Sequence, residues 1–141
     1  RALTTNPCSE IGMQPYDACR LMAINLLGFV RNPFKGDETW FDIDKFKSVV
    51  YEAMRLSDNL IDLELEKIDI IIDKIKNDPE SEEIKRRELK LWRKVRDEAS
   101  SSRRTGIGFT ALGDTLAAMG IKYDSEKGLY FIKNIMREFA R

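Results

Sequence analysis

The chain of 141 residues contains no histidine, only two cysteines and four prolines, and no excess of either charge, because 24 lysines and arginines balance 24 aspartates and glutamates. Without histidine, the commonest general base and metal ligand are absent, and so are the Ser-His-Asp and Cys-His nucleophile systems. A net charge of zero gives no indication of a nucleic-acid partner. Any chemistry must therefore depend on carboxylates, amides or thiols.

The scarcity of cysteine and the lack of long hydrophobic runs also restrict the class of protein. Cys8 and Cys19 are too few for a disulfide-stapled scaffold or a four-thiolate zinc site, so we expect two reduced thiols. The longest apolar stretch, residues 21–30, is about half of the ~20 residues that span a bilayer, and no signal-peptide pattern occurs. We expect a cytoplasmic protein without a membrane partner. Because the chain begins at Arg1 and ends at Arg141 inside a helical pattern, we expect an internal segment of something longer.

What is present divides the chain into three predicted segments, which are residues 1–36, 37–102 and 103–141. In the first segment, prolines and a glycine favour a structured loop over residues 1–17. The apolar run over residues 18–30 fits either a buried strand or a short core helix, and we favour the strand.

The middle segment predicts a helical hairpin. Charged residues make up 34% of the chain, above the ~25% of an average domain, as expected of long solvated helices. Apolar residues recur at three- and four-residue spacing over residues 43–76, with Asp42 as the N-cap. The Asp-Pro pair at residues 78–79 predicts a stop and then a second helix over residues 79–99, with the proline at its first position. We expect a loop at residues 100–102.

The last segment predicts an extended stretch over residues 103–109 and two helices. Thr110 can cap the first helix, Gly120 can close it in the left-handed conformation, and Ser125 can begin the second. The whole chain is therefore expected to be mostly α-helical, with a loop that could carry chemistry and one or two short strands.

A thiol lies between an amide and a carboxylate at Asn6-Pro7-Cys8-Ser9-Glu10. If this stretch is extended, side chains two residues apart point to the same side, and Asn6, Cys8 and Glu10 can converge on one polar substrate. A neutral thiol that gives and takes a hydrogen atom suits this setting better than a nucleophilic thiolate. The structural alternative is that Cys8 is a small buried apolar group and Glu10 is solvated.

Three further signals each have a structural alternative. Cys19 follows eleven residues after Cys8, which fits neither a CxxC motif nor a metal pair, and a buried core cysteine is the default interpretation. The Gly-x-Gly at residues 106–108 could let backbone N–H groups approach a phosphate, but a tight backbone crossing explains it at least as well. Acidic residues at helical spacing are interpreted as surface charges rather than ligands of a hard cation; they are Asp58, Asp62, Glu64, Glu66 and Asp69.

Several short motifs follow one another along nearly the whole chain, at residues 5–10, 17–21, 24–26, 103–108 and 111–114. The asparagine-cysteine-glutamate triplet, the second cysteine and the double-arginine glycine segment together resemble the large catalytic chain of ribonucleotide reductase. The resemblance is greatest to the adenosylcobalamin-dependent class, in the form that has a long helical hairpin.

The resemblance implies an α/β parent protein, a barrel of ten strands with Cys8 at the tip of a central finger loop. Cys8 would be the thiyl-radical cysteine that abstracts the ribose 3′ hydrogen. Glu10 would accept the 3′ hydroxyl proton, and Asn6 would hold the substrate hydroxyls by hydrogen bonds. Cys19 would be one half of the dithiol that supplies reducing equivalents.

The resemblance also implies partners. The substrate would be a ribonucleoside di- or triphosphate and the reductant thioredoxin-like. The cofactor would be adenosylcobalamin, bound outside this segment, with a separate metal-containing radical subunit as the alternative. The remaining parts of the reductase chain would supply the other dithiol cysteine, so the segment alone is expected to be inactive, and the parent could form a homodimer.

Two functions of other classes stay open. A helical protein-interaction module could be built on the charged hairpin of residues 43–99. Cys8 and Cys19 could instead form a thiol redox switch without catalysis.

Overall fold

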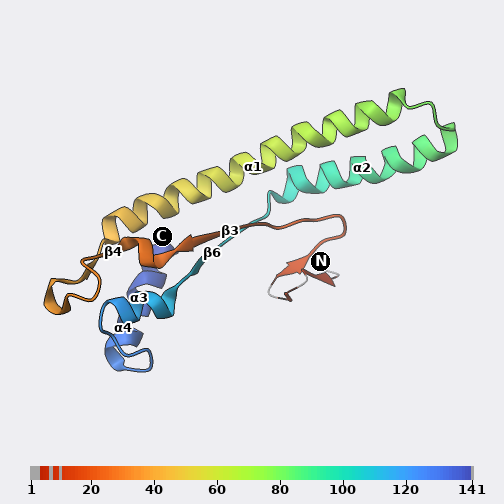
Figure 1. Ribbon diagram of the computed structural model, residues 1–141. Coiled ribbons are helices and arrows are strands. Elements are labelled where there is room, and N and C mark those ends of the chain that lie inside the picture. The colour runs from red at the N-terminus through yellow and green to blue at the C-terminus, as the bar shows by residue number, and fades with distance from the viewer. Residues whose placement is uncertain (1–3, 7, 10, 141) are drawn as a thin grey trace. The chain divides into compact units, whose positions relative to one another are not determined.

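The computed structural model describes residues 4–6, 8, 9 and 11–140. The chain divides into two compact units, one of Arg1–Leu21 with Leu56–Gly106 and one of Met22–Arg55 with Ile107–Arg141. The three-segment division stays a prediction. The elements follow one another along the chain (Figure 1) as β1 (Thr4–Thr5), β2 (Gly12–Met13), β3 (Arg20–Asn25), the 3-10 helix η1 (Leu26–Phe29), β4 (Val30–Arg31), the 3-10 helix η2 (Gly36–Glu38), β5 (Trp40–Phe41), α1 (Ile43–Asn77), α2 (Glu82–Ser102), β6 (Thr105–Thr110), α3 (Leu112–Ala118) and α4 (Glu126–Phe139).

Helix α1 has the bounds that its sequence predicts to within one residue. The backbone N–H of Lys45 donates to Oδ1 of Asp42 at 3.1 Å, which confirms Asp42 as the residue that caps this helix. Arg31 binds the same carboxylate, with Nη2 2.9 Å from Oδ2. Two hydrogen bonds hold the pKa of Asp42 below its ordinary value. The bond from the N–H of Lys45 has the larger effect, and the bond from the Arg31 side chain has the next largest.

Helix α2 begins later than predicted, at Glu82 rather than Pro79. The Asp78 carboxylate accepts from the N–H of Glu80 at 3.2 Å, so it closes a turn instead of capping a helix. Ser81, in an extended conformation, is the residue before the first helical one. The prediction of Pro79 at the first helical position is therefore wrong.

Helix α2 also ends later than predicted, because residues 100–102 form its last turn and not a loop. Serine is a weak helix former, which is why the local sequence favoured a loop. Arg103 follows with a φ of 40°, and its N–H donates to the carbonyl of Ala99 at 3.2 Å. A left-handed residue at this position is a common way to end a helix.

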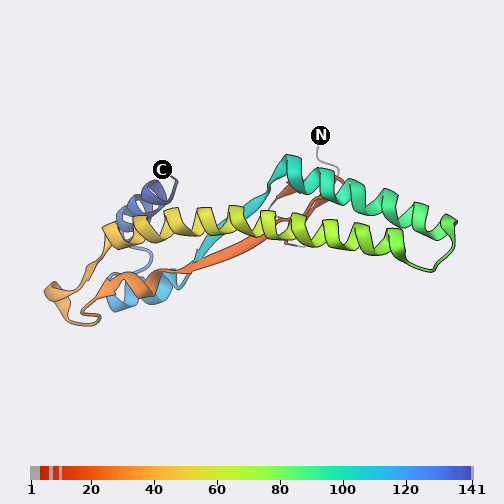
Figure 2. The ribbon, with the colours of Figure 1, turned by 90° about the horizontal axis from the view of Figure 1, so that it is seen from above.

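Helices α1 and α2 run side by side as the antiparallel hairpin that the sequence predicts (Figures 1 and 2). In the unit that contains residues 56–106, Ile68, Ile72 and Ala99 form a buried cluster. Arg96 of α2 binds Asp69 of α1, with Nε 2.6 Å from Oδ1. The apolar side chains that pack around the cluster are Leu65, Leu89, Trp92 and Val95.

The second unit has an aromatic core around the first turns of α1. Phe46 is fully buried and lies edge-on to Phe29, with ring centroids 5.4 Å apart. Phe41, Phe131 and Phe139 extend this cluster through further ring contacts. Edge-on rings add to the burial of apolar surface, so these phenylalanines hold strand β5, helix α1 and helix α4 together.

Helices α3 and α4 confirm two of their three predicted ends. Thr110 does not cap α3, because it ends strand β6, and Ala111, with a φ of 61°, precedes the helix. Gly120 closes α3 as predicted, with a φ of +64° that suits glycine. Ser125 caps α4, because its hydroxyl accepts from a backbone N–H of the first turn.

Strand pairing in the described residues is limited to three two-stranded sheets, β1–β2, β3–β6 and β4–β5, which form no closed barrel. The chain is mostly helical as predicted, but the residues that the structure describes contain six strands rather than one or two. Four of them are only two residues long, too short for sequence periodicity to reveal. Within the apolar run of residues 18–30, β3 and Val30, the first residue of β4, are extended, and η1 separates them because Asn25 accepts from the N–H of Leu27 and starts this 3-10 helix. In the part of the chain that the structure describes, no helix is long and apolar enough to cross a membrane.

Candidate functional site

A β-hairpin presents the candidate cysteine Cys8. Strands β1 and β2 pair antiparallel, so the described residues 6, 8, 9 and 11 belong to the connection between them. The N–H of Ser9 donates to the carbonyl of Asn6 at 3.0 Å, and Ser9 has a φ of 64°. This turn places Cys8 near the tip of the hairpin, where the residue is exposed.

Asn6 holds this loop from the inside. The residue is only 7% exposed, and its side-chain Oδ1 accepts from the N–H of Ile11 at 3.1 Å. The N–H of Asn6 donates to the carbonyl of Ile11 at 3.2 Å, which closes the same pair of residues a second time. A buried amide that is satisfied by backbone groups therefore fixes the loop that carries Cys8.

The chain turns at Ser9 rather than running extended, so the condition under which convergence was expected is not met for Asn6 and Cys8, and convergence of the three side chains stays a prediction. Asn6 is buried and Cys8 is exposed, so the alternation of an extended strand does not apply to them. Glu10 lies outside the described residues. The structural alternative for Cys8, a small buried apolar group, is also wrong, because the residue is exposed and its thiol is free.

A pocket of about 420 Å³ at the base of the hairpin has both Asn6 and Cys19 in its lining. Cys19 is a free thiol and is only partly buried, so it is not the fully buried cysteine of the default interpretation. The structure thus brings together two of the four predicted site residues. Cys8 is not among the described residues that line this pocket.

Gly106 makes room for Cys19. A Cβ atom at Gly106 would lie 3.0 Å from Sγ of Cys19 and 2.8 Å from Cδ2 of Leu21. At Gly108, two residues along the same strand, the same position has no atom within 4 Å. Side chains therefore approach the backbone closely at Gly106 and not at Gly108, and the backbone crossing that was one explanation of the Gly-x-Gly stays a prediction.

A buried carboxylate anchors the segment that leads to Cys19. The Asp17 side chain has no exposed surface, and its Oδ2 lies 2.5 Å from Nε of Arg104. Asp17 Oδ1 also accepts from the Ser102 hydroxyl at 3.2 Å and from the N–H of Ala18 at 2.8 Å. Because three donors replace water around this carboxylate, the segment before Cys19 is fixed to the segment that enters strand β6.

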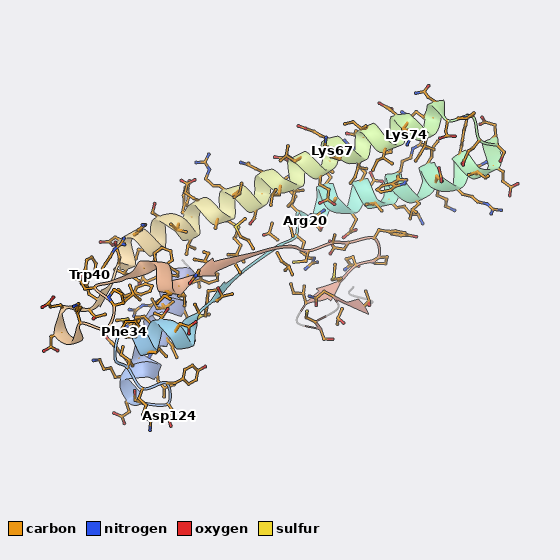
Figure 3. The ribbon with its side chains drawn as sticks, in the orientation of Figure 1. Arg20, Phe34, Trp40, Lys67, Lys74 and Asp124 are labelled. Carbon is orange, nitrogen blue, oxygen red and sulfur yellow. The ribbon has the colours of Figure 1, made fainter. Side chains whose placement is uncertain are left out.

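Two more arginines attach this region to helix α1. Arg103 donates to Asp58 and to Asp62, each at 2.8 Å. The hydrogen bond from Arg103 lowers the pKa of Asp58, and the bonds to Asp58 and then Asp62 raise the pKa of Arg103. Arg20 (Figure 3) lies with Nε 2.5 Å from Oε2 of Glu64. Together with Asp69, which binds Arg96, four of the five acidic residues at helical spacing are thus partners of arginines.

Asp17, Arg20 and Arg104 lie in motifs that the sequence shows, but the sequence did not indicate which residues they contact. The bonds from Arg104 and Ser102 to Asp17 join residues 87 and 85 positions apart. The bond from Arg20 to Glu64 joins residues 44 positions apart. No local spacing rule relates positions so distant. The only available signal was that one motif contains the acidic residue Asp17 and another contains the basic residue Arg104.

The described residues do not fit a corrinoid or a metal ion. The pocket at the hairpin and two others, of about 580 and 500 Å³, have the size of sites for small ligands, and a cobalamin with its nucleotide tail is much larger. Within the described ranges, no group of three or more Cys, Asp or Glu side chains could hold a metal ion. The described residues therefore have no role in binding adenosylcobalamin in the mechanism below.

Comparison with known proteins agrees with the resemblance of the motifs. A family model described as "Ribonucleotide reductase, barrel domain" matches residues 2–140. A vitamin B12-dependent ribonucleoside-diphosphate reductase of Mycobacterium tuberculosis is 30% identical over the whole chain, which covers 16% of that protein. A protein with the same name from Thermoplasma acidophilum is 28% identical over 94% of the chain and 14% of its own length. A vitamin B12-dependent ribonucleotide reductase of Streptomyces coelicolor is 29% identical over 88% of the chain and 10% of its own length.

The chain therefore spans about one sixth of the length of two of the curated relatives that it matches. No solved structure matches the chain.

Proposed function

Because the chain belongs to the ribonucleotide reductase barrel-domain family, we propose that it forms part of the active site of an adenosylcobalamin-dependent ribonucleotide reductase. The full-length protein converts ribonucleotides to deoxyribonucleotides for DNA synthesis, and the segment alone is inactive. The names of the relatives, which are vitamin B12-dependent reductases, support this class. A reductase with a separate metal-containing radical subunit is the alternative.

One observation carries the proposal. The pocket at the base of the β1–β2 hairpin contains Asn6 and Cys19, and the loop that Asn6 holds carries the exposed thiol of Cys8. A pocket of small-ligand size that contains one thiol, and whose lining residue Asn6 also holds the loop that carries a second thiol, supports thiol-based reduction of a small polar substrate.

In this proposal Cys8 is the hydrogen-transfer group. After a radical generator elsewhere in the parent protein has removed the thiol hydrogen, the sulfur of Cys8 takes the hydrogen atom from the ribose 3′ carbon and later returns it. Glu10 accepts the proton of the 3′ hydroxyl, and Asn6 holds the substrate hydroxyls. None of these steps needs an imidazole, which is consistent with a chain without histidine.

Cys19 supplies the electrons together with a second cysteine elsewhere in the parent chain. Replacement of the 2′ hydroxyl by hydrogen consumes two electrons and two protons and releases water. Oxidation of two thiols to one disulfide supplies both, and a thioredoxin-like reductant then restores the thiols. The partial exposure of Cys19 at the pocket supports this role.

The rest of the enzyme follows from the family. The remaining parts of the reductase chain complete a ten-stranded α/β barrel around the loop, bind the phosphates of a ribonucleoside di- or triphosphate, and bind adenosylcobalamin. The parent is placed in the cytoplasm, where deoxyribonucleotides are made, and a homodimer is its expected assembly.

The test is the assay of the full-length reductase for deoxyribonucleotide formation with and without adenosylcobalamin. Cys8→Ser and Glu10→Ala should abolish turnover, and so should Cys19→Ser, because one thiol alone cannot supply the two electrons by forming a disulfide. Ser48→Ala, at an exposed position of α1, is the control and should keep full activity.

The possible results separate the hypotheses. Turnover that needs the cofactor and disappears in Cys8→Ser supports both the reaction and the class. Turnover only with a metal-containing subunit keeps the reaction and changes the class. An intact long chain without reductase activity would contradict the proposal. It would favour the alternative in which the helical hairpin is a protein-interaction module. Mass mapping of a Cys8–Cys19 disulfide in that inactive protein would favour the redox switch.

A further inference from the structure

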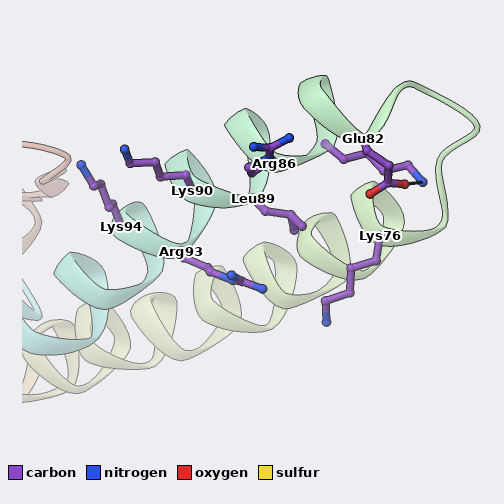
Figure 4. Close-up of a pocket in the computed structure, with 8 residues that line it drawn as sticks. Lys76, Glu82, Arg86, Leu89, Lys90, Arg93 and Lys94 are labelled. Carbon is purple, nitrogen blue, oxygen red and sulfur yellow. Dashed lines mark hydrogen bonds and ion pairs between the residues drawn. The ribbon is translucent and has the colours of Figure 1, made fainter.

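The helical hairpin carries a strongly basic groove far in sequence from Cys8 and Cys19 (Figure 4). It has a volume of about 580 Å³, and six cationic side chains and one carboxylate stand around a single apolar residue, Leu89. In a chain with zero net charge, this is a local concentration of one sign. The lining residues are Lys76, Glu82, Lys85, Arg86, Leu89, Lys90, Arg93 and Lys94.

Half of these cations have partners in the protein. Lys85 lies 3.2 Å from Glu82, and Lys76 lies 2.7 Å from Asp73. The ammonium group of Lys94 lies over the ring of Tyr16, 5.0 Å from its centroid.

The other half of the cations make no such contact. Among the described residues, Arg86, Lys90 and Arg93 have no hydrogen bond or ion pair. All three are exposed side chains of one helix. Within the part of the chain that the structure describes, no acidic side chain forms an ion pair with these three positive charges.

The spacing of these residues opposes helix stability. Arg86, Lys90 and Lys94 follow one another at intervals of four residues on α2, and like charges at this spacing destabilise a helix. Successive members of the row are ~6 Å apart along the helix axis. An anion with several charges a few ångströms apart would relieve the repulsion at more than one position.

We propose that this groove binds a polyphosphate chain, supplied by a nucleoside triphosphate or by inorganic polyphosphate. A phosphate chain places several negative charges within a small volume, and arginine forks match its oxygens. The groove volume suits a small molecule of this kind. Leu89 and the aliphatic stems of the lysines and arginines provide an apolar floor that could also carry the base of a nucleotide.

The experiment is titration calorimetry of the full-length protein with inorganic tripolyphosphate, ATP and adenosine as separate probes. Hydrogen exchange of the peptide that covers residues 82–94, with and without tripolyphosphate, reports binding at the groove itself. The variant is Lys90→Gln with Arg93→Gln, both at exposed positions. The control is Arg87→Gln, which removes a cation 79% exposed on the same helix but outside the groove.

Tripolyphosphate should protect residues 82–94 from exchange, and the double variant should weaken this binding about tenfold or more. The affinity should also fall as salt rises, because several charge pairs form. Tripolyphosphate binding together with tighter ATP binding, both weakened in the double variant, would identify the nucleoside triphosphate as the source, and equal affinities would identify inorganic polyphosphate. Equal loss in Arg87→Gln, equal binding of adenosine, or no protection of residues 82–94 would overturn the proposal. None of these readouts uses the activity of Cys8, so they are independent of the proposed reductase function.

Discussion

Arg104 donates through Nε to the carboxylate of Asp17, across 2.5 Å and 87 residues of sequence, and the Asp17 side chain is fully buried. The pair joins two motifs that resemble the same family, the one that contains Cys19 and the double-arginine segment. Gly106 lies two residues after Arg104, and a Cβ added there would lie 3.0 Å from Sγ of Cys19, so the ion pair and the glycine both lie close in sequence or in space to this thiol. The two motifs therefore form one structural unit around Cys19.

Replacement of Asp17 by alanine should destabilise the protein strongly. The change removes the acceptor of three hydrogen bonds, from Arg104, Ser102 and Ala18, and leaves a partly buried guanidinium without its partner. Such losses typically cost about 2–4 kcal/mol. The measurement is the chemical denaturation midpoint of the full-length protein. Asp124→Ala, at a carboxylate that is 72% exposed, should change the free energy of unfolding by no more than about 0.5 kcal/mol. Equal effects of the two substitutions would show that the buried pair does not hold this region.

Gly106→Ala should displace Cys19, whereas Gly108→Ala should not. The new Cβ at Gly106 would meet Sγ of Cys19 and Cδ2 of Leu21, both at the ends of side chains that can move. We therefore expect a modest cost of about 1 kcal/mol and a changed rate of alkylation of Cys19, read by peptide mass mapping. Gly108 has open space around it and is the matched control on the same strand. An unchanged Cys19 rate in Gly106→Ala would contradict the contact.

The parts of the fold that the sequence predicted are those fixed by neighbours along the chain. Helix α1 was predictable because its apolar spacing and the Asp42 cap are both local, and Gly120 and Ser125 likewise mark helix ends by their own chemistry. The start of α2 was not, because Asp78 can either cap a helix or close a turn, and both use the same side chain. Local sequence does not decide between two local uses of one carboxylate.

In the candidate site, too, local sequence could predict some features and not others. The local spacing indicated Asn6, Cys8 and Glu10, and only the family resemblance gave Cys19 a role; the structure places Asn6 and Cys19 at one pocket. The spacing could not indicate that Asn6 is buried as a brace of its loop, because that depends on the turn at Ser9. The contact between Gly106 and Cys19 depends on strand packing between distant segments, which has no local signature.

The ion pair between Asp69 and Arg96 should make the hairpin less stable in acid. The hydrogen bond from Arg96 holds the pKa of Asp69 below its ordinary value of 3.8, so the folded state binds this proton less readily than the unfolded state. The stabilisation is then fully present above the unfolded pKa and is lost as the pH falls through the folded pKa. The measurement is the difference in Tm between the parent protein and Asp69→Asn as a function of pH.

This difference in Tm should be constant near neutral pH and should shrink below about pH 4. Added salt should also reduce it, because both side chains are well exposed. Glu88→Gln removes an exposed carboxylate of α2 that makes no hydrogen bond or ion pair among the described residues, and it should show no comparable pH-dependent difference. A difference that grows as the pH falls would contradict the assignment.

Two glycines of the C-terminal helices should respond to alanine in opposite directions. In α4, a Cβ at Gly128 would lie 2.7 Å from the carbonyl oxygen of Lys122 and 2.9 Å from that of Tyr123. These are backbone atoms that cannot rotate away, so Gly128→Ala should destabilise the protein by about 1–3 kcal/mol. In α3, the same position at Gly113 is open, and alanine costs less backbone entropy in a helix than glycine. Gly113→Ala should therefore stabilise the protein by about 0.5 kcal/mol. Denaturation midpoints of the two variants measure the difference, and a stabilising Gly128→Ala would show that the turn before α4 is looser than its carbonyl contacts imply.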